Sequence, residues 1–127
     1  MIAAVSPALL VAAVLWVAEF PDARADAAVG KRTLVVRLGA PAAAWGFVAL
    51  VAMAHGWVWA WWQAQWLPTN AGWALATVVP AALAAMLLVR RCRAPRTLRP
   101  AIAWTLVAAV AHPLLLAAAY GSVVALR

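Results

Sequence analysis

The sequence predicts an all-α, polytopic membrane protein with about four transmembrane helices, which form part of a larger helical bundle. The 127-residue chain is 69% apolar, and its mean hydropathy is +0.96. Charged residues make up only 10% of the chain, and four long stretches contain none of them. A soluble domain of this length does not carry so much apolar sequence, so we interpret residues 1–127 as a single membrane domain.

Each of the four apolar stretches is long enough to be a transmembrane helix. They cover residues 2–18, 40–62, 69–89 and 101–126. At ~1.5 Å per residue, helices of these lengths reach roughly 25 to 39 Å, against a hydrocarbon core of ~30 Å. The first stretch is the shortest and begins directly after Met1, which suggests that further sequence belongs upstream of it.

The connections predict an orientation. Nine of the ten cations lie in residues 19–39 and 90–100; they are Arg24, Lys31, Arg32, Arg37, Arg90, Arg91, Arg93, Arg96 and Arg99. Alternating spans place these two connections on one side, which the positive-inside rule makes cytoplasmic. We therefore expect an integral protein of the cell (inner) membrane, with both termini and residues 63–68 outside. The net charge of +7 follows from this bias and from contact with lipid headgroups, so nucleic acid binding is not invoked.

Tryptophan occurs where the predicted helices meet the membrane surfaces. Six tryptophans flank the uncharged outer turn, namely Trp57, Trp59, Trp61, Trp62, Trp66 and Trp73. Trp16, Trp45 and Trp104 lie near the predicted cytoplasmic ends. This distribution is typical of an aromatic belt. The alternative interpretation is a set of buried core tryptophans or a cluster on which a quinone stacks.

The acidic residues form the most informative pattern in the chain. All three, Glu19, Asp22 and Asp26, lie within eight consecutive positions. On a helix of ~3.6 residues per turn this spacing rotates by about 300° and then about 700°, so the three carboxylates share one face. Carboxylates at a membrane boundary followed by clustered cations indicate a divalent metal that carries a phosphorylated ligand. The alternative is a solvated connection in which Asp26 merely pairs with Arg24 or Lys31.

The segment that begins at Glu19 resembles a known family motif. It reads Glu-Phe-Pro-Asp-Ala-Arg-Ala-Asp-Ala-Ala-Val-Gly-Lys-Arg-Thr-Leu. This resembles the second aspartate-rich motif of the UbiA superfamily of intramembrane prenyltransferases. It is most similar to the 1,4-dihydroxy-2-naphthoate polyprenyltransferases of the menaquinone branch, whose motif runs Asn-Glu-Phe-Pro-Asp-x-x-x-Asp-x-x-x-Gly-Lys-Arg-Thr-Leu. The matching positions are Glu19, Phe20, Pro21, Asp22, Asp26, Gly30, Lys31, Arg32, Thr33 and Leu34.

The resemblance implies a function and a set of site residues. A polyprenyl group would pass from an allylic diphosphate to an aromatic acceptor such as 1,4-dihydroxy-2-naphthoate. Asp22 and Asp26 would hold Mg²⁺, because this ion usually binds one or two carboxylates together with phosphate oxygens. Lys31, Arg32 and Arg37 would bind the diphosphate. Pro21 interrupts the backbone hydrogen bonding beside Glu19, which we therefore expect to support the metal ligands rather than to bind the metal.

The chain departs from the family in length and in three positions. Family members have about nine helices and two aspartate-rich motifs, whereas this chain has four apolar stretches and one motif. It therefore resembles the C-terminal part of such an enzyme. Ala18 replaces the usual Asn, and Ala23 and Ala27 replace an aromatic and a basic residue. Either the chain works together with an N-terminal half or another copy, or it is a non-catalytic fragment or assembly partner; a small transporter is a more distant alternative.

Three residues inside or beside the spans receive a structural interpretation. His55 and His112 lie mid-span, and we expect each to be a neutral imidazole bonded to a neighbouring helix. Cys92 is the only cysteine and predicts no disulfide or paired metal site. The competing account of the N-terminus is a signal peptide over residues 2–18 with a cleavage site near Ala23, but no cation precedes the apolar run.

Overall fold

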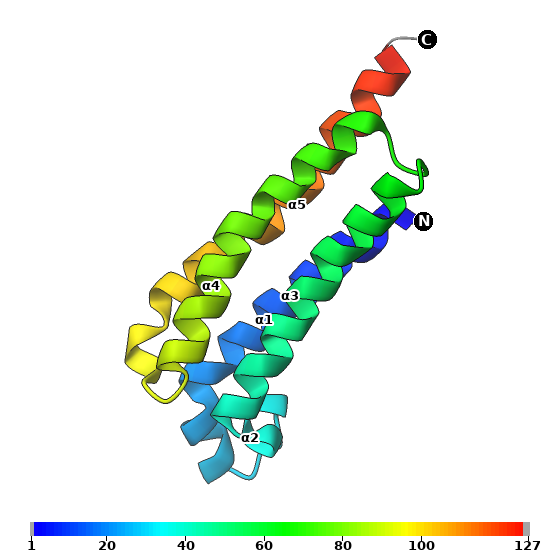
Figure 1. The fold of residues 1–127 in the computed structure, drawn as a ribbon. Coiled ribbons are helices and arrows are strands. Elements are labelled where there is room, and N and C mark those ends of the chain that lie inside the picture. Colours follow the sequence, from blue (N-terminus) through cyan, green and yellow to red (C-terminus); the bar gives the residue numbers. More distant parts are fainter. Residues whose placement is uncertain (1, 126–127) are drawn as a thin grey trace.

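Residues 2–125 are described by a computed structural model, in which every regular element is a helix. Four long helical segments run side by side (Figure 1), and we call them rods: Ile2–Ala28, Ala40–Gln63, Thr69–Arg91 and Arg99–Val124. The helices are α1 (Ile2–Ala28), α2 (Leu34–Leu38), α3 (Ala40–Gln63), η1 (Thr69–Thr77), α4 (Val78–Arg91), η2 (Pro95–Thr97) and α5 (Arg99–Ala125). Four of the described segments are long and apolar enough to cross a membrane, so the predicted fold class is confirmed and the chain is an integral membrane protein. Residue 126, which ends the predicted fourth span, lies outside the described residues.

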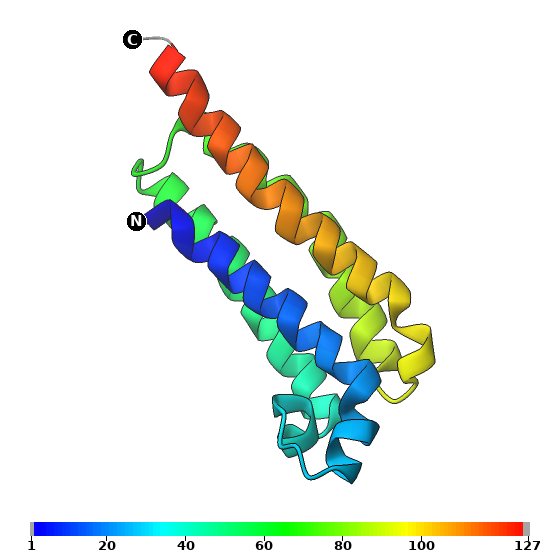
Figure 2. The ribbon, with the colours of Figure 1, turned by 180° about the vertical axis from the view of Figure 1, so that it is seen from behind.

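The rods form two antiparallel pairs. Helix α1 packs along α3 and also contacts α5, while α4 packs along α5 (Figures 1 and 2). The α2 segment and the connection between α4 and α5 lie at one end of the bundle (Figure 2). The turn after α3 and the start of α1 lie at the other end. The two basic connections therefore share one end, as four alternating spans require; we call it the charged end.

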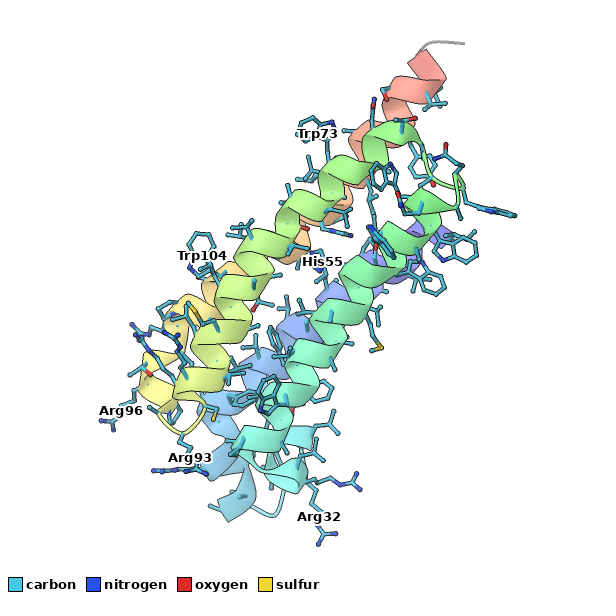
Figure 3. The ribbon with its side chains drawn as sticks, viewed as in Figure 1. Arg32, His55, Trp73, Arg93, Arg96 and Trp104 are labelled. Atoms are coloured by element: carbon cyan, nitrogen blue, oxygen red, sulfur yellow. The ribbon has the colours of Figure 1, made fainter. Side chains whose placement is uncertain are left out.

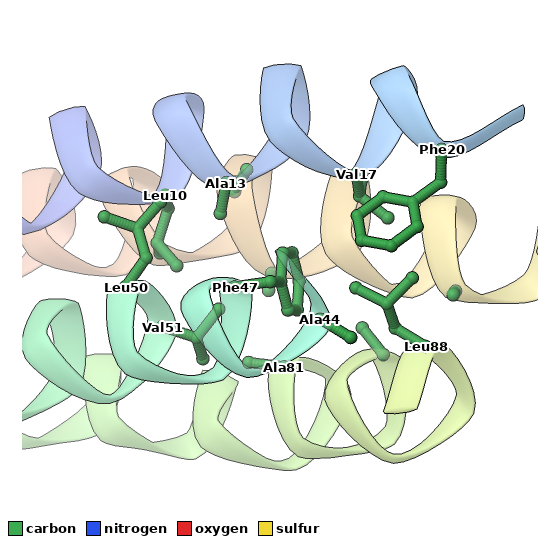
Figure 4. Close-up of a cluster of buried hydrophobic side chains, with 14 of the residues drawn as sticks. Leu10, Ala13, Val17, Phe20, Ala44, Phe47, Leu50, Val51, Ala81 and Leu88 are labelled. Atoms are coloured by element: carbon green, nitrogen blue, oxygen red, sulfur yellow. The ribbon is translucent and has the colours of Figure 1, made fainter. Parts of the chain in front are cut away.

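Small side chains allow the rods to approach one another. Nine buried alanines belong to the central core, namely Ala13, Ala43, Ala44, Ala54, Ala81, Ala84, Ala101, Ala108 and Ala109. Phe47, Leu10 and Leu88 fill the space between them and are fully buried (Figure 4). In a bilayer the lipid tails are as apolar as leucine, so helices associate through close packing rather than through escape from water. Alanines, with a few larger apolar side chains between them, achieve this packing.

The first helix is ten residues longer than predicted. The sequence places residues 19–39 in a connection, but α1 continues through Pro21 to Ala28. A single proline removes one backbone hydrogen bond, and the alanines that follow it favour the helical state. The helix ends where Gly30 adopts φ +78°, with Lys31 N–H donating to Asp26 O (2.9 Å) and Gly30 N–H to Ala27 O (3.2 Å). This pair of bonds is a Schellman ending, and a glycine satisfies its left-handed position without strain.

The third rod is not the uniform α-helix predicted for residues 69–89. Its first nine residues, Thr69–Thr77, form a 3₁₀ helix, and α4 begins at Val78. Pro80 has no N–H to offer Ala76 and would crowd that carbonyl in an α-helix, so it is tolerated only within the first turn. A 3₁₀ helix rises ~2.0 Å per residue rather than ~1.5 Å, which lengthens the rod without adding residues.

The tryptophans divide between the surface and the helix contacts. Trp45, Trp59, Trp66, Trp73 and Trp104 are exposed on the bundle surface, where lipid would surround them. Trp16 differs, because its ring lies over Gly46 of α3 and a Cβ at that glycine would come within 2.8 Å of the ring. Trp16 thus contributes to the contact between α1 and α3. Figure 3 shows Trp73 toward the end of the bundle opposite Arg93 and Arg96.

Candidate functional site

The three carboxylates occupy the last turns of α1 at the charged end. Because the helix runs to Ala28, their spacing places them on one side of α1, as expected for an uninterrupted helix. Glu19 is half-buried, and its Oε2 accepts a hydrogen bond from the Val35 backbone N–H at 3.3 Å. This bond ties α2 back against α1. Asp22 is exposed, one turn before Asp26.

Asp26 has a cation partner. Its Oδ1 lies 3.1 Å from Lys31 Nζ, and the aspartate side chain is 16% exposed while the lysine is 67% exposed. The Schellman ending produces this pair, because it turns the chain so that Lys31 returns to the final turn of the helix. The alternative interpretation of the sequence, in which Asp26 pairs with Arg24 or Lys31, is therefore confirmed for the pair with Lys31.

The carboxylates fit part of a magnesium site. Asp22 and Asp26 lie one helical turn apart, which suits two carboxylates on one hydrated ion that also binds phosphate. Within residues 2–125, however, no three side chains of the His, Cys, Asp and Glu types come together as a metal-binding group. The described chain therefore supplies two ligands, and further oxygen ligands would have to come from a phosphate group, water or another chain.

The predicted diphosphate-binding cations are spread out at this end. Lys31 is engaged with Asp26, while Arg32 and Arg37 are exposed on either side of the Thr33 cap of α2. Thr33 Oγ1 accepts from Val36 N–H at 3.4 Å and so begins that short helix. Arg32 projects away from the bundle (Figure 3). Among the described residues, Lys31 is the only one of these three cations that forms a salt bridge with a carboxylate.

The structure gathers a different set of cations that the sequence pattern does not single out. Arg24, Arg96 and Arg99 line an open cleft of about 790 Å³ between α1 and the connection from α4 to α5. Arg24 and Arg96 also line an adjoining cleft of about 450 Å³ with Arg93. The sequence contains a signal for this arrangement, because the positive-inside rule places both basic connections on one side of the membrane. Their meeting across α1 depends on how the helices pack.

Both histidines belong to one buried hydrogen-bonded network in the middle of the bundle. His112 of α5 joins Ser6 of α1 (Nε2 to Oγ, 2.9 Å) and Thr77 (Nδ1 to Oγ1, 2.8 Å). His55 of α3 joins the same Thr77 hydroxyl (Nε2 to Oγ1, 3.1 Å) and the Val51 carbonyl (Nδ1 to O, 2.9 Å). The expectation that each histidine bonds a neighbouring helix is confirmed, and Figure 3 shows His55 between the rods.

Donor and acceptor counting assigns roles within this network when both rings are neutral. A carbonyl oxygen only accepts, so His55 Nδ1 carries a proton, and Nε2 of a neutral ring is then an acceptor. The Thr77 hydroxyl then offers its single proton to His55 Nε2 or to Ala74 O, which lies 2.6 Å away. Thr77 Oγ1 accepts from His112 Nδ1, and His112 Nε2 accepts from Ser6. The network links all four rods, and this role is structural.

Comparison of the chain with protein-family models, with curated proteins and with solved structures gives no match. The resemblance to the prenyltransferases thus remains a prediction based on the motif.

Proposed function

We propose that this chain is the C-terminal portion of an intramembrane prenyltransferase, which transfers a polyprenyl group from an allylic diphosphate to an aromatic acceptor. The acceptor class is a dihydroxynaphthoate such as 1,4-dihydroxy-2-naphthoate, in menaquinone-type quinone biosynthesis. One observation carries the proposal: Asp22 and Asp26 lie one turn apart on the end of a helix that is long enough to span a membrane. Carboxylates are costly at such a boundary unless a ligand uses them.

The residues around the carboxylates have distinct roles in this proposal. Asp22 and Asp26 hold the cation, and Glu19 keeps α2 beside them through its bond to Val35. Bound Mg²⁺ would supply positive charge where the diphosphate accumulates negative charge as it leaves. Lys31, Arg32 and Arg37 add positive charge at the charged end of the protein. The apolar rods bind the isoprenoid chain and exclude water from the allylic cation.

The proposed orientation places the charged end in the cytoplasm of a cell whose inner membrane holds the protein. Three exposed alanines provide a test, because cysteine at each disturbs no packing: Ala28, Ala64 and Ala94. In a Cys92→Ala background, a membrane-impermeant thiol reagent applied to intact cells should label Ala64→Cys only. Labelling of Ala28→Cys and Ala94→Cys without Ala64→Cys would reverse the orientation and move the carboxylates outside.

A second candidate function is a non-catalytic membrane fragment or assembly partner that keeps an inherited motif. The observation that favours it is the incomplete ligand set, since residues 2–125 gather no group of three metal-binding side chains. Activity of the chain with and without a second half separates the two functions.

Purified alone in lipid, the chain should produce no prenylated product above the enzyme-free background, because it holds only part of the metal site. The measurement is product formation from a long-chain allylic diphosphate and 1,4-dihydroxy-2-naphthoate. Addition of a membrane partner that contributes an Asn-Asp-x-x-Asp-x-x-x-Asp motif should restore Mg²⁺-dependent turnover. Turnover by the chain alone would mean that copies of one motif complete the site, whereas no turnover with any such partner would favour the non-catalytic function.

A further inference from the structure

A large cleft in the described part of the chain lies at the charged end and is lined by arginines. Its walls are Pro21 and Arg24 of α1, Pro95 and Arg96 of η2, and Arg99 and Ile102 of α5. Its volume of about 790 Å³ falls within the range of roughly 300–1,000 Å³ that is usual for small-molecule sites. The adjoining cleft shares Arg24, Pro95 and Arg96, and it adds Arg93. We call these two adjoining spaces the arginine cleft.

No carboxylate lines the arginine cleft. The acidic residues lie on another face of α1: Asp22 and Asp26 are within about 60° of Glu19 around the helix, whereas Arg24 is rotated by about 140°. The one salt bridge among the described residues joins Lys31 to Asp26 and does not involve these arginines. Four arginines thus line two adjoining spaces with no acidic side chain among the lining residues, and a bound anion would relieve the repulsion between their charges.

The arginines from the α4–α5 connection are held by ordered backbone. Thr97 bonds back to Ala94 through both its N–H (2.9 Å) and its hydroxyl (2.8 Å). Leu98 is fully buried in the core, so the residues on either side of it are fixed relative to α1. Arg96 and Arg99 flank this buried anchor. The cleft therefore does not depend on a freely moving loop.

The wall composition indicates the ligand class. Guanidinium groups bind phosphate and carboxylate oxygens in a planar, two-pronged geometry. A phosphate group also has three acceptor oxygens, so it can engage several guanidinium groups at once. Ile102 and Pro21 provide an apolar wall beside them. A phosphate or diphosphate group with an apolar substituent satisfies both features. Two sources share this chemistry: the headgroup of an anionic membrane lipid and a free phosphate compound.

We propose that Arg24, Arg93, Arg96 and Arg99 form a binding site for a phosphate or diphosphate group, separate from the carboxylate face of α1. The site does not use Asp22 or Asp26, so it requires neither Mg²⁺ nor the proposed prenyl transfer.

The test uses the full chain in nanodiscs of neutral phosphatidylcholine, without divalent cations. Binding of inorganic diphosphate is measured by calorimetry, and binding of phosphatidic acid is measured by its enrichment around the protein in mixed nanodiscs. The test variants are Arg96→Gln/Arg99→Gln on one wall and Arg24→Gln on the other. The matched control is Arg91→Gln, which removes the same charge from an exposed position outside both clefts.

Arg24→Gln should weaken phosphate binding about fivefold, because one cation near a membrane surface contributes roughly that factor to the binding of an anion. The double variant removes two cations and should weaken binding at least about tenfold. Arg91→Gln should change binding less than about twofold. If the test variants lose only the enrichment of phosphatidic acid, the ligand is a lipid headgroup. If they lose the binding of inorganic diphosphate, the ligand is a free phosphate compound. Equal effects of Arg91→Gln and Arg24→Gln, or no binding of either probe to the wild type, overturn the proposal.

Circular dichroism of each variant separates binding from folding. If the double variant loses helicity, Arg24→Gln on the opposite wall decides the outcome. Asp22→Asn should leave both probes bound as in the wild type, so the failure of the prenyltransferase proposal would not be mistaken for the failure of this one.

Discussion

Asp22→Asn and Asp26→Asn should each lower prenyl transfer by roughly a hundredfold or more in the active assembly, because each removes a charge that stabilises the departing diphosphate. Asparagine keeps the shape of the side chain, so the loss reports charge rather than packing. The measurement is turnover at saturating allylic diphosphate, together with its Mg²⁺ dependence. Lys31→Ala should have a smaller effect, because Arg32 and Arg37 keep part of the positive charge at this end of the protein.

The fold should survive these substitutions. The Lys31–Asp26 pair is well exposed on the lysine side and contributes well under ~1 kcal/mol to stability. Asp22→Glu, which retains the carboxylate, is the matched control and should keep a measurable part of the activity. If both asparagine variants retain the wild-type rate and Mg²⁺ dependence, the carboxylates are not the metal ligands and the proposed function loses its main support.

Replacement of His112 by alanine should destabilise the bundle by about 2–4 kcal/mol, because it opens a cavity and leaves two polar partners without their bond. His112 is fully buried and joins Ser6 on α1 to Thr77 at the start of α4. Single hydrogen bonds inside membrane proteins average only ~0.6 kcal/mol, so the cavity contributes the larger share. Reversible unfolding in mixed detergent micelles measures this difference.

Val110→Ala on the same helix is the control for His112→Ala. Val110 is 58% exposed on the bundle surface, so its truncation should cost within about 0.5 kcal/mol. Ser6→Ala removes one bond of the network without a large cavity and should fall between the two. Equal stability of His112→Ala and Val110→Ala would show that the network does not hold the rods together. The specific activity of the folded fraction should not change in any of these variants, because the network is remote from the carboxylate face.

The candidate site was predictable to different degrees for its different residues. The shared face of Glu19, Asp22 and Asp26 follows from spacing alone, provided that the helix continues. The predicted first helix ends at residue 18, because Pro21 and the charges that follow are typical of a helix boundary. Gly30 was the missed signal, since a glycine just after an alanine-rich stretch is typical of a helix end. The bond from Val35 to Glu19 could not be predicted, because it depends on how α2 folds back.

The sequence by itself determined that the chain is helical and crosses a membrane, and that its cations belong to one end. These properties depend on the hydrophobicity and charge of continuous segments, which any packing of the helices preserves. Only the tertiary structure decided which side chains meet across helices. His55 and His112 are separated by 57 positions, yet both bond Thr77. Arg24 and Arg96 likewise line one cleft only because α1 packs against η2 and α5. Such meetings depend on helix rotation and register, which in a bilayer are selected by close packing of small residues such as Ala13 and Ala108 and are not encoded in any local pattern.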